Sequence, residues 1–137
     1  MKNIFLSLLI FIVMSILHFQ FTEWTIILLK LPGGDFGMYS YLILIFCSLI
    51  TAIGLVTVII FRKNYNSVIK IAILFEIIYL FFLVISGNNP FLYFFESKSE
   101  NLLMTMMYLI SLIVFLLFCL IHLIHQKIIF SKNKNLS

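Results

Sequence analysis

The chain has 137 residues, of which 64% are hydrophobic and only 10% are charged. A soluble domain has roughly 45–50% apolar and about 25% charged residues. The composition therefore excludes an ordinary globular domain, a disordered chain and a nucleic-acid-binding protein. Nine Lys and Arg against five Asp and Glu give a formal net charge of +4. Because the basic residues flank apolar stretches, they indicate how the chain is oriented in a lipid bilayer. We therefore expect no nucleic-acid partner.

Four apolar runs are long enough to cross a bilayer, which needs about 20 residues per helix. The predicted spans are residues 4–22, 39–61, 68–87 and 102–124. No small-x-small cleavage pattern follows the first run, so we expect an uncleaved helix that ends near Thr22 to Trp24, with residues 25–31 as a short interfacial turn. The sequence predicts an all-α membrane protein, a four-transmembrane-helix bundle formed by a single domain over residues 1–137.

Local sequence signals agree with these limits. Asn66 or Ser67 can cap the third helix, and residues 97–100 fit an S-x-x-E capping box before the fourth. The segment 87–90, which contains Gly and Pro, is expected to end the third helix.

The Lys and Arg residues predict the orientation. With the N-terminus inside, the outer segments contain only Lys30 and Lys98, and the other seven basic residues are cytoplasmic: Lys2, Arg62, Lys63, Lys70, Lys127, Lys132 and Lys134. This bias is typical of a protein with both termini in the cytoplasm. We expect a multi-pass protein of a bacterial inner (plasma) membrane.

Glu76 is the one ionisable residue deep in a predicted span, about 12 Å from its start at 1.5 Å per residue. A charge at this depth is costly, so the carboxyl group should face the bundle interior, be paired or be protonated. Tyr79, at i+3, lies on the same face and can donate to it. Thr51 of the second span and Ser111 of the fourth lie at comparable depth. The carboxyl group either ties helices together, pairs with a partner subunit, or binds a proton or cation; the structural roles are favoured.

Small and weakly polar residues follow the second span: Cys47, Ser48, Thr51, Ala52, Gly54 and Thr57. Small residues let helix backbones approach closely in lipid. We therefore expect the second span at the centre of the bundle, with a polar pore lining as the alternative.

No pattern supports a metal, a cofactor or a disulfide. His122 and His125 share a face of the fourth span, but no acidic or Cys ligand lies on their side of the membrane, and His18 is expected at the opposite interface. Cys47 and Cys119 are predicted at depths that differ by roughly 13 Å, too far apart for a disulfide. Without a catalytic grouping, we expect no enzymatic activity.

The glycine-rich segment 33–37 lacks the Lys-Ser/Thr of a phosphate-binding loop. It is expected to form a tight outer turn, and the alternative is a recognition loop in which Gly34, Asp35 and Phe36 contact a partner.

In size, span number and basic cytoplasmic segments, the chain resembles the immunity proteins that protect bacteria from pore-forming bacteriocins. This resemblance concerns architecture. We expect a non-enzymatic protein acting through helix and outer-loop contacts with a membrane-protein partner or a second copy, as an accessory subunit or immunity-type protein. The alternative is a small oligomeric proton- or ion-coupled transporter or channel that uses Glu76.

Overall fold

The computed structural model describes residues 2–86 and 99–135, in which all the regular secondary structure is helical. The elements are α1 (Lys2–Leu28), α2 (Gly33–Phe36), α3 (Tyr39–Ile60), α4 (Val68–Ile85) and α6 (Ser99–Asn135). All but the four-residue α2 are long and apolar enough to cross a membrane. Within the described residues, the prediction of four helices that are long and apolar enough to span a membrane is confirmed.

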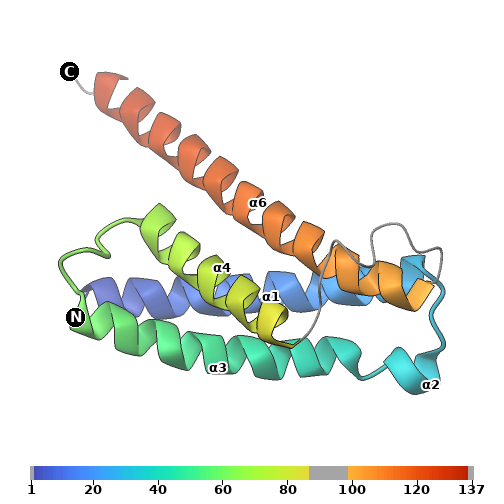
Figure 1. The fold of residues 1–137 in the computed structure, drawn as a ribbon. Helices are drawn as coiled ribbons and strands as arrows, with labels where there is room; N and C mark the ends of the chain where they lie inside the picture. Colours follow the sequence, from blue (N-terminus) through green and yellow to red (C-terminus); the bar gives the residue numbers. More distant parts are fainter. Residues whose placement is uncertain (1, 87–98, 136–137) are drawn as a thin grey trace.

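The four long helices form a bundle around α1 and α4. Each of these two helices contacts all three of the other spans, whereas α3 packs mainly against α1 (Figure 1). The expectation that the second span forms the centre is therefore wrong. Ser48 and Ala52 of its small-residue face are exposed, whereas Ser15, His18 and Thr22 are polar residues of α1 that lie buried inside the bundle.

Close packing between α1 and α3 depends on Gly54. A Cβ atom at this position would lie 2.8 Å from Cε2 of Phe11, a ring that is itself fully buried. A glycine is therefore required where α3 meets α1, as the small-residue pattern predicted.

α1 continues to Leu28, beyond its predicted end, and residues 25–28 belong to the helix rather than to a separate turn. Thr22 and Thr25 do not interrupt the helix because their hydroxyl groups donate to the carbonyls of His18 and Phe21, at 2.7 and 2.8 Å. Lys30, two residues beyond the end of the helix, has a φ of 52°, the left-handed conformation that is common just after helix C-termini.

The start of α4 at Val68 agrees with the prediction. Ser67 occupies the N-cap position with an extended backbone, but its side chain makes no capping hydrogen bond. Asn66 instead accepts a hydrogen bond from Lys70, 3.3 Å away, so neither side chain caps the helix as expected. Residues 87–90 and the first two positions of the proposed capping box lie outside the described residues.

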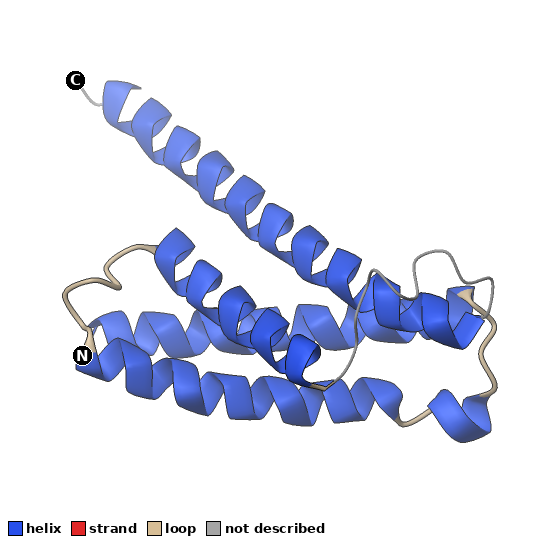
Figure 2. Cartoon of the chain, in the orientation of Figure 1, coloured by secondary structure: helices blue, strands red, loops and turns tan. Residues whose placement is uncertain are grey.

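α6 is longer than predicted and reaches Asn135, with 37 residues. At 1.5 Å per residue it is about 55 Å long, nearly twice the roughly 30 Å of a hydrocarbon core. Its first half packs against α1 and α4, and its second half diverges from the bundle (Figures 1 and 2).

Candidate functional site

A network of buried polar side chains joins three spans inside the bundle. Glu76 of α4 is 6% exposed. Its Oε1 lies 3.0 Å from Nε2 of His18, a residue of α1 that is completely buried. The other carboxyl oxygen, Oε2, accepts a hydrogen bond from the hydroxyl of Ser111 on α6. We call these three residues the Glu76 network. Each oxygen of the carboxyl group thus has a partner on a different helix.

The three residues meet because they lie at similar depths. The α2 end of the bundle is the end where α1 finishes and α3 begins. Measured from this end at 1.5 Å per residue, His18 is about 15 Å along α1, Glu76 about 14 Å along α4, and Ser111 about 18 Å along α6. A helix that crosses roughly 30 Å of hydrocarbon has its midpoint near these positions. The Glu76 network therefore lies at the midpoint of α4 and at a similar distance from the α2 end on α1 and α6.

Sequence reasoning missed His18. It was placed at the outer interface because the first helix was expected to end near Thr22, whereas α1 continues for six more residues to Leu28. A signal was present in the sequence. Ser15, His18 and Thr22 recur at i, i+3 and i+7, which places all three on one face of an otherwise apolar helix. Polar residues that repeat on one face of a span indicate the bundle interior.

Tyr79 does not donate to Glu76, so this part of the prediction is wrong. Its ring instead packs against the imidazole of His18, with the ring centroids 4.1 Å apart. Its hydroxyl group is buried and has no hydrogen-bond partner in the described part of the chain. Tyr79 therefore supports the Glu76 network through its ring and leaves its hydroxyl free for another use.

Thr51 does not join the network either. Its hydroxyl donates to the carbonyl oxygen of Cys47, one turn earlier on α3, at 2.8 Å. Cys47, which is buried on α3, is a free thiol, as is Cys119. Among the described residues, no group of three His, Cys, Asp or Glu side chains could hold a metal ion.

The pair formed by His18 and Glu76 can hold a shared proton. A carboxylic acid can donate to the imidazole nitrogen, or a protonated nitrogen can donate to the carboxylate, and the 3.0 Å separation fits both arrangements. Ser111 can donate to Oε2 in either case, since that oxygen accepts. The second imidazole nitrogen, Nδ1, is buried without a hydrogen-bond partner among the described residues. The site is therefore suited to binding a proton or to linking helices.

The loop candidates lie apart from this site, in α2. The Phe36 amide donates to the carbonyl of Pro32 at 3.1 Å, and the Phe36 side chain is half-buried. A Cβ at Gly34 would meet no atom within 4 Å, so this position is open. The side chain of Asp35 lies outside the described part of the structure. The segment is thus a short helical turn that leads into α3.

Comparison of the chain with known proteins finds no matching family model, curated protein or solved structure.

Proposed function

We propose that the chain is a non-enzymatic, multi-pass protein of a bacterial inner membrane, with both termini in the cytoplasm, that binds a membrane-protein partner. It would act as an accessory subunit or an immunity-type protein. The observation that supports this proposal is the second half of α6, which leaves the bundle while remaining apolar (Figure 1).

The diverging half of α6 has large, exposed apolar side chains over most of its circumference. Those that are at least 47% exposed are Leu116, Leu120, Ile121, Leu123, Ile124, Ile128, Ile129 and Phe130. By contrast Leu103, Met107 and Val114 in the first half are completely buried. The second half of α6 therefore contributes little to the core of its own bundle and is available to another helix.

Polar side chains interrupt this apolar surface on one face. Cys119, His122 and Gln126 follow one another at i, i+3 and i+7, with His125 beside them. Two helices in lipid gain no hydrophobic driving force from associating, and polar side chains that hydrogen-bond between helices are one source of attraction. We name these four residues the α6 polar face, and we assign it to a helix of the partner.

The Glu76 network supports this role by fixing the direction of α6. Ser111 belongs to the first half of α6 and is held by Glu76 of α4, which His18 of α1 holds in turn. The second half then projects from a fixed base. Basic residues at its end, Lys132 and Lys134, are suited to anionic headgroups at the cytoplasmic surface.

Site-specific photo-crosslinking in native membranes tests the proposal. A photoreactive residue at Gln126 should form an adduct with one defined membrane protein or with a second copy of the chain. The matched control is Ile124, which is 50% exposed at a similar depth but on the opposite side of the helix. Equal adducts at both positions, or adducts with lipid alone, would contradict the assignment.

Two further experiments separate the two forms of the proposal. An immunity-type protein should protect bacteria that express it from a pore-forming toxin. Replacing His122 and Gln126 by Leu should reduce this protection at unchanged protein level. An accessory subunit should instead co-purify with its partner in mild detergent and lose it after the same two replacements.

A proton-coupled transporter is the second candidate, and the buried pair of His18 and Glu76 favours it. A titratable pair in the middle of a span is the usual location for proton binding in transporters. The test is proton flux into proteoliposomes, in which Glu76→Gln should abolish transport while Gln126→Leu leaves it unchanged. A pair that only links helices would give no flux in the unmodified protein.

A further inference from the structure

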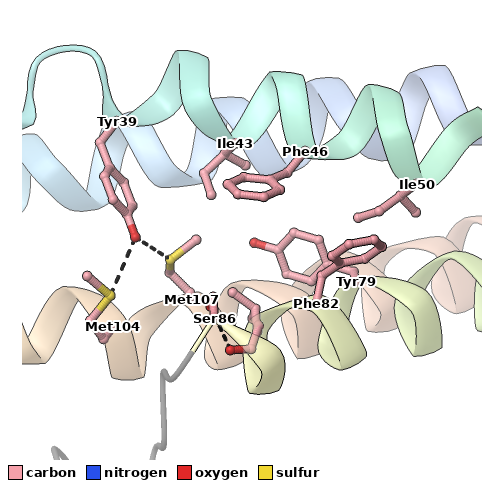
Figure 3. A pocket seen from close by; sticks show the side chains of 10 residues that line it. Tyr39, Ile43, Phe46, Ile50, Tyr79, Phe82, Ser86, Met104 and Met107 are labelled. Atoms are coloured by element: carbon pink, nitrogen blue, oxygen red, sulfur yellow. Dashed lines mark hydrogen bonds between the residues drawn. The ribbon is translucent and has the colours of Figure 1, made fainter.

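A cavity of about 220 Å³ lies beside the Glu76 network, between α3, α4 and α6 (Figure 3). It occupies the half of the bundle toward the α2 end, since Tyr39 begins α3 and Ser86 follows the last residue of α4. Four aromatic rings and two thioethers dominate the walls, from Tyr39, Phe46, Tyr79, Phe82, Met104 and Met107. An apolar cavity of about 150 Å³ is enough to bind benzene, so this one has room for a single ring with a short substituent.

The cavity contains a polar group that makes no hydrogen bond with the described residues. Tyr79 is 2% exposed, and its hydroxyl has no hydrogen-bond partner among the described residues. Figure 3 shows this hydroxyl pointing into the cavity, toward the side where Ile43 and Met107 lie. Leaving a buried polar group unpaired costs roughly 1–3 kcal/mol. A partner that enters the cavity would remove this cost.

The other two hydroxyl groups of the cavity are already engaged. Tyr39 donates to the sulfur atoms of Met104 and Met107, which lie 3.4 and 3.3 Å from its oxygen. Ser86 donates to the carbonyl of Leu83 at 2.7 Å. The protons of these two hydroxyl groups are therefore already donated, whereas the Tyr79 hydroxyl proton has no acceptor among the described residues and can be donated to a ligand.

We propose that this cavity binds a small, neutral, membrane-soluble aromatic molecule that carries one carbonyl oxygen. The carbonyl oxygen accepts the hydrogen bond of Tyr79, and the ring packs among the aromatic side chains and the methionine sulfurs. Sulfur atoms contact aromatic rings favourably, at about 5 Å. Edge-to-face and offset-stacked ring pairs are also favourable at centroid distances of roughly 4.5–7 Å. Tyr79 is thus the residue that selects a carbonyl compound over a hydrocarbon.

The position of Tyr79 also places the ligand next to the Glu76 network. The ring of Tyr79 packs against His18 on one side, and its hydroxyl end reaches the cavity. Occupation of the cavity would therefore immobilise the ring that covers the imidazole. The partner-binding α6 polar face lies at the other end of α6, so this inference is independent of the proposed function.

The test compares the binding of two ligands of the same shape, of which only one has a hydrogen-bond acceptor. 4′-Fluoroacetophenone carries the carbonyl oxygen, and 4-fluoro-α-methylstyrene has a CH₂ group in its place. Binding is followed by ¹⁹F NMR titration of nanodiscs that contain the full chain, with empty nanodiscs to subtract partition into lipid. We expect the ketone to bind more tightly than the hydrocarbon by about tenfold, the ratio given by one hydrogen bond of about 1.4 kcal/mol.

Tyr79→Phe should lower ketone affinity about tenfold and leave hydrocarbon affinity unchanged, since the ring and its contact with His18 are kept. Tyr41→Phe is the matched control, because Tyr41 is 54% exposed and outside the cavity. Ile43→Phe, which fills the cavity, should abolish binding of both ligands. Equal affinity for the two ligands would overturn the proposal. Ketone binding equal to that of empty nanodiscs would also overturn it, as would an unchanged ketone affinity in a folded Tyr79→Phe variant.

Discussion

Glu76 and Tyr79 lie one turn apart on α4, and their buried polar groups differ in hydrogen bonding. At Glu76 both carboxyl oxygens have partners, one on α1 and one on α6. At Tyr79 the hydroxyl has none in the described part of the chain and points into a cavity. Because unpaired polar groups are costly in a low-dielectric interior, the first arrangement is typical of a structural link and the second of a binding site. The comparison predicts opposite responses to substitution.

Removing the Glu76 side chain should have the largest effect. Glu76→Ala leaves His18 and Ser111 without their partner, and breaking a buried pair from one side costs about 3–5 kcal/mol. The free energy of unfolding, measured by SDS titration of detergent-solubilised protein, should fall by this amount. Glu76→Gln keeps an acceptor and a donor in the same place and should cost about 1 kcal/mol.

Ile77 provides the control for this substitution. It is the next residue along α4 but is 59% exposed on the lipid-facing side, so Ile77→Ala removes few internal contacts. A loss for Glu76→Ala no larger than that for Ile77→Ala would mean that the Glu76 network does not hold the bundle together.

The packing beneath the Glu76 network should resist added volume. Gly54→Ala would place a methyl group against the ring of Phe11, which packs on Phe75 with centroids 5.6 Å apart. Phe75 in turn lies against His18. Overpacking of this kind costs about 1–3 kcal/mol, and thermal unfolding in detergent should show it.

Gly34→Ala is the matched glycine control, since a Cβ there meets nothing within 4 Å and the residue is helical. Its free energy of unfolding should stay within about 1 kcal/mol of the unmodified chain, with a gain favoured. If both substitutions lower the free energy of unfolding equally, the contact between residue 54 and Phe11 is not the cause of the loss.

Ser111 should give a smaller effect than Gly54. Ser111→Ala leaves Oε2 of Glu76 without a partner and should cost about 1 kcal/mol in the free energy of unfolding. Thr51→Ala is the comparison, because the Thr51 hydroxyl only donates to a backbone carbonyl one turn away. It should change stability by less than about 0.5 kcal/mol. If Ser111→Ala and Thr51→Ala lower the free energy of unfolding equally, the hydrogen bond between α6 and Glu76 does not stabilise the bundle.

Most of the fold could be predicted from the sequence, because span number depends on the lengths of apolar runs. The starts of α3 at Tyr39 and α4 at Val68 match the runs directly. Both helix ends that were misplaced, at Leu28 and Asn135, lie in segments that mix polar and apolar residues. The composition of such segments does not define where a helix stops, since threonines that bond to the backbone can continue it.

The candidate site was only half predictable. The depth of Glu76 and Ser111 follows from counting residues along a helix, so both were identified. Pairing across helices depends on how each helix is rotated, and the sequence pattern left that open. Tyr79 was therefore given the hydrogen bond that His18 makes, and His18 itself was missed because the first helix was expected to end near it.

Tyr79→Phe should have the smallest effect on stability and the opposite sign from Glu76→Ala. It removes a buried hydroxyl without a partner in the described structure and keeps the ring against His18, so the free energy of unfolding should stay the same or rise by up to about 1 kcal/mol. SDS titration in the absence of added ligand measures this change in the free energy of unfolding.

A ligand that binds only the folded protein adds stability as its concentration rises. The ketone should therefore stabilise the unmodified chain more than the variant. A Tyr79→Phe loss as large as that of Ser111→Ala without ligand would mean that the hydroxyl is already satisfied, and the contrast between the two regions of α4 would disappear.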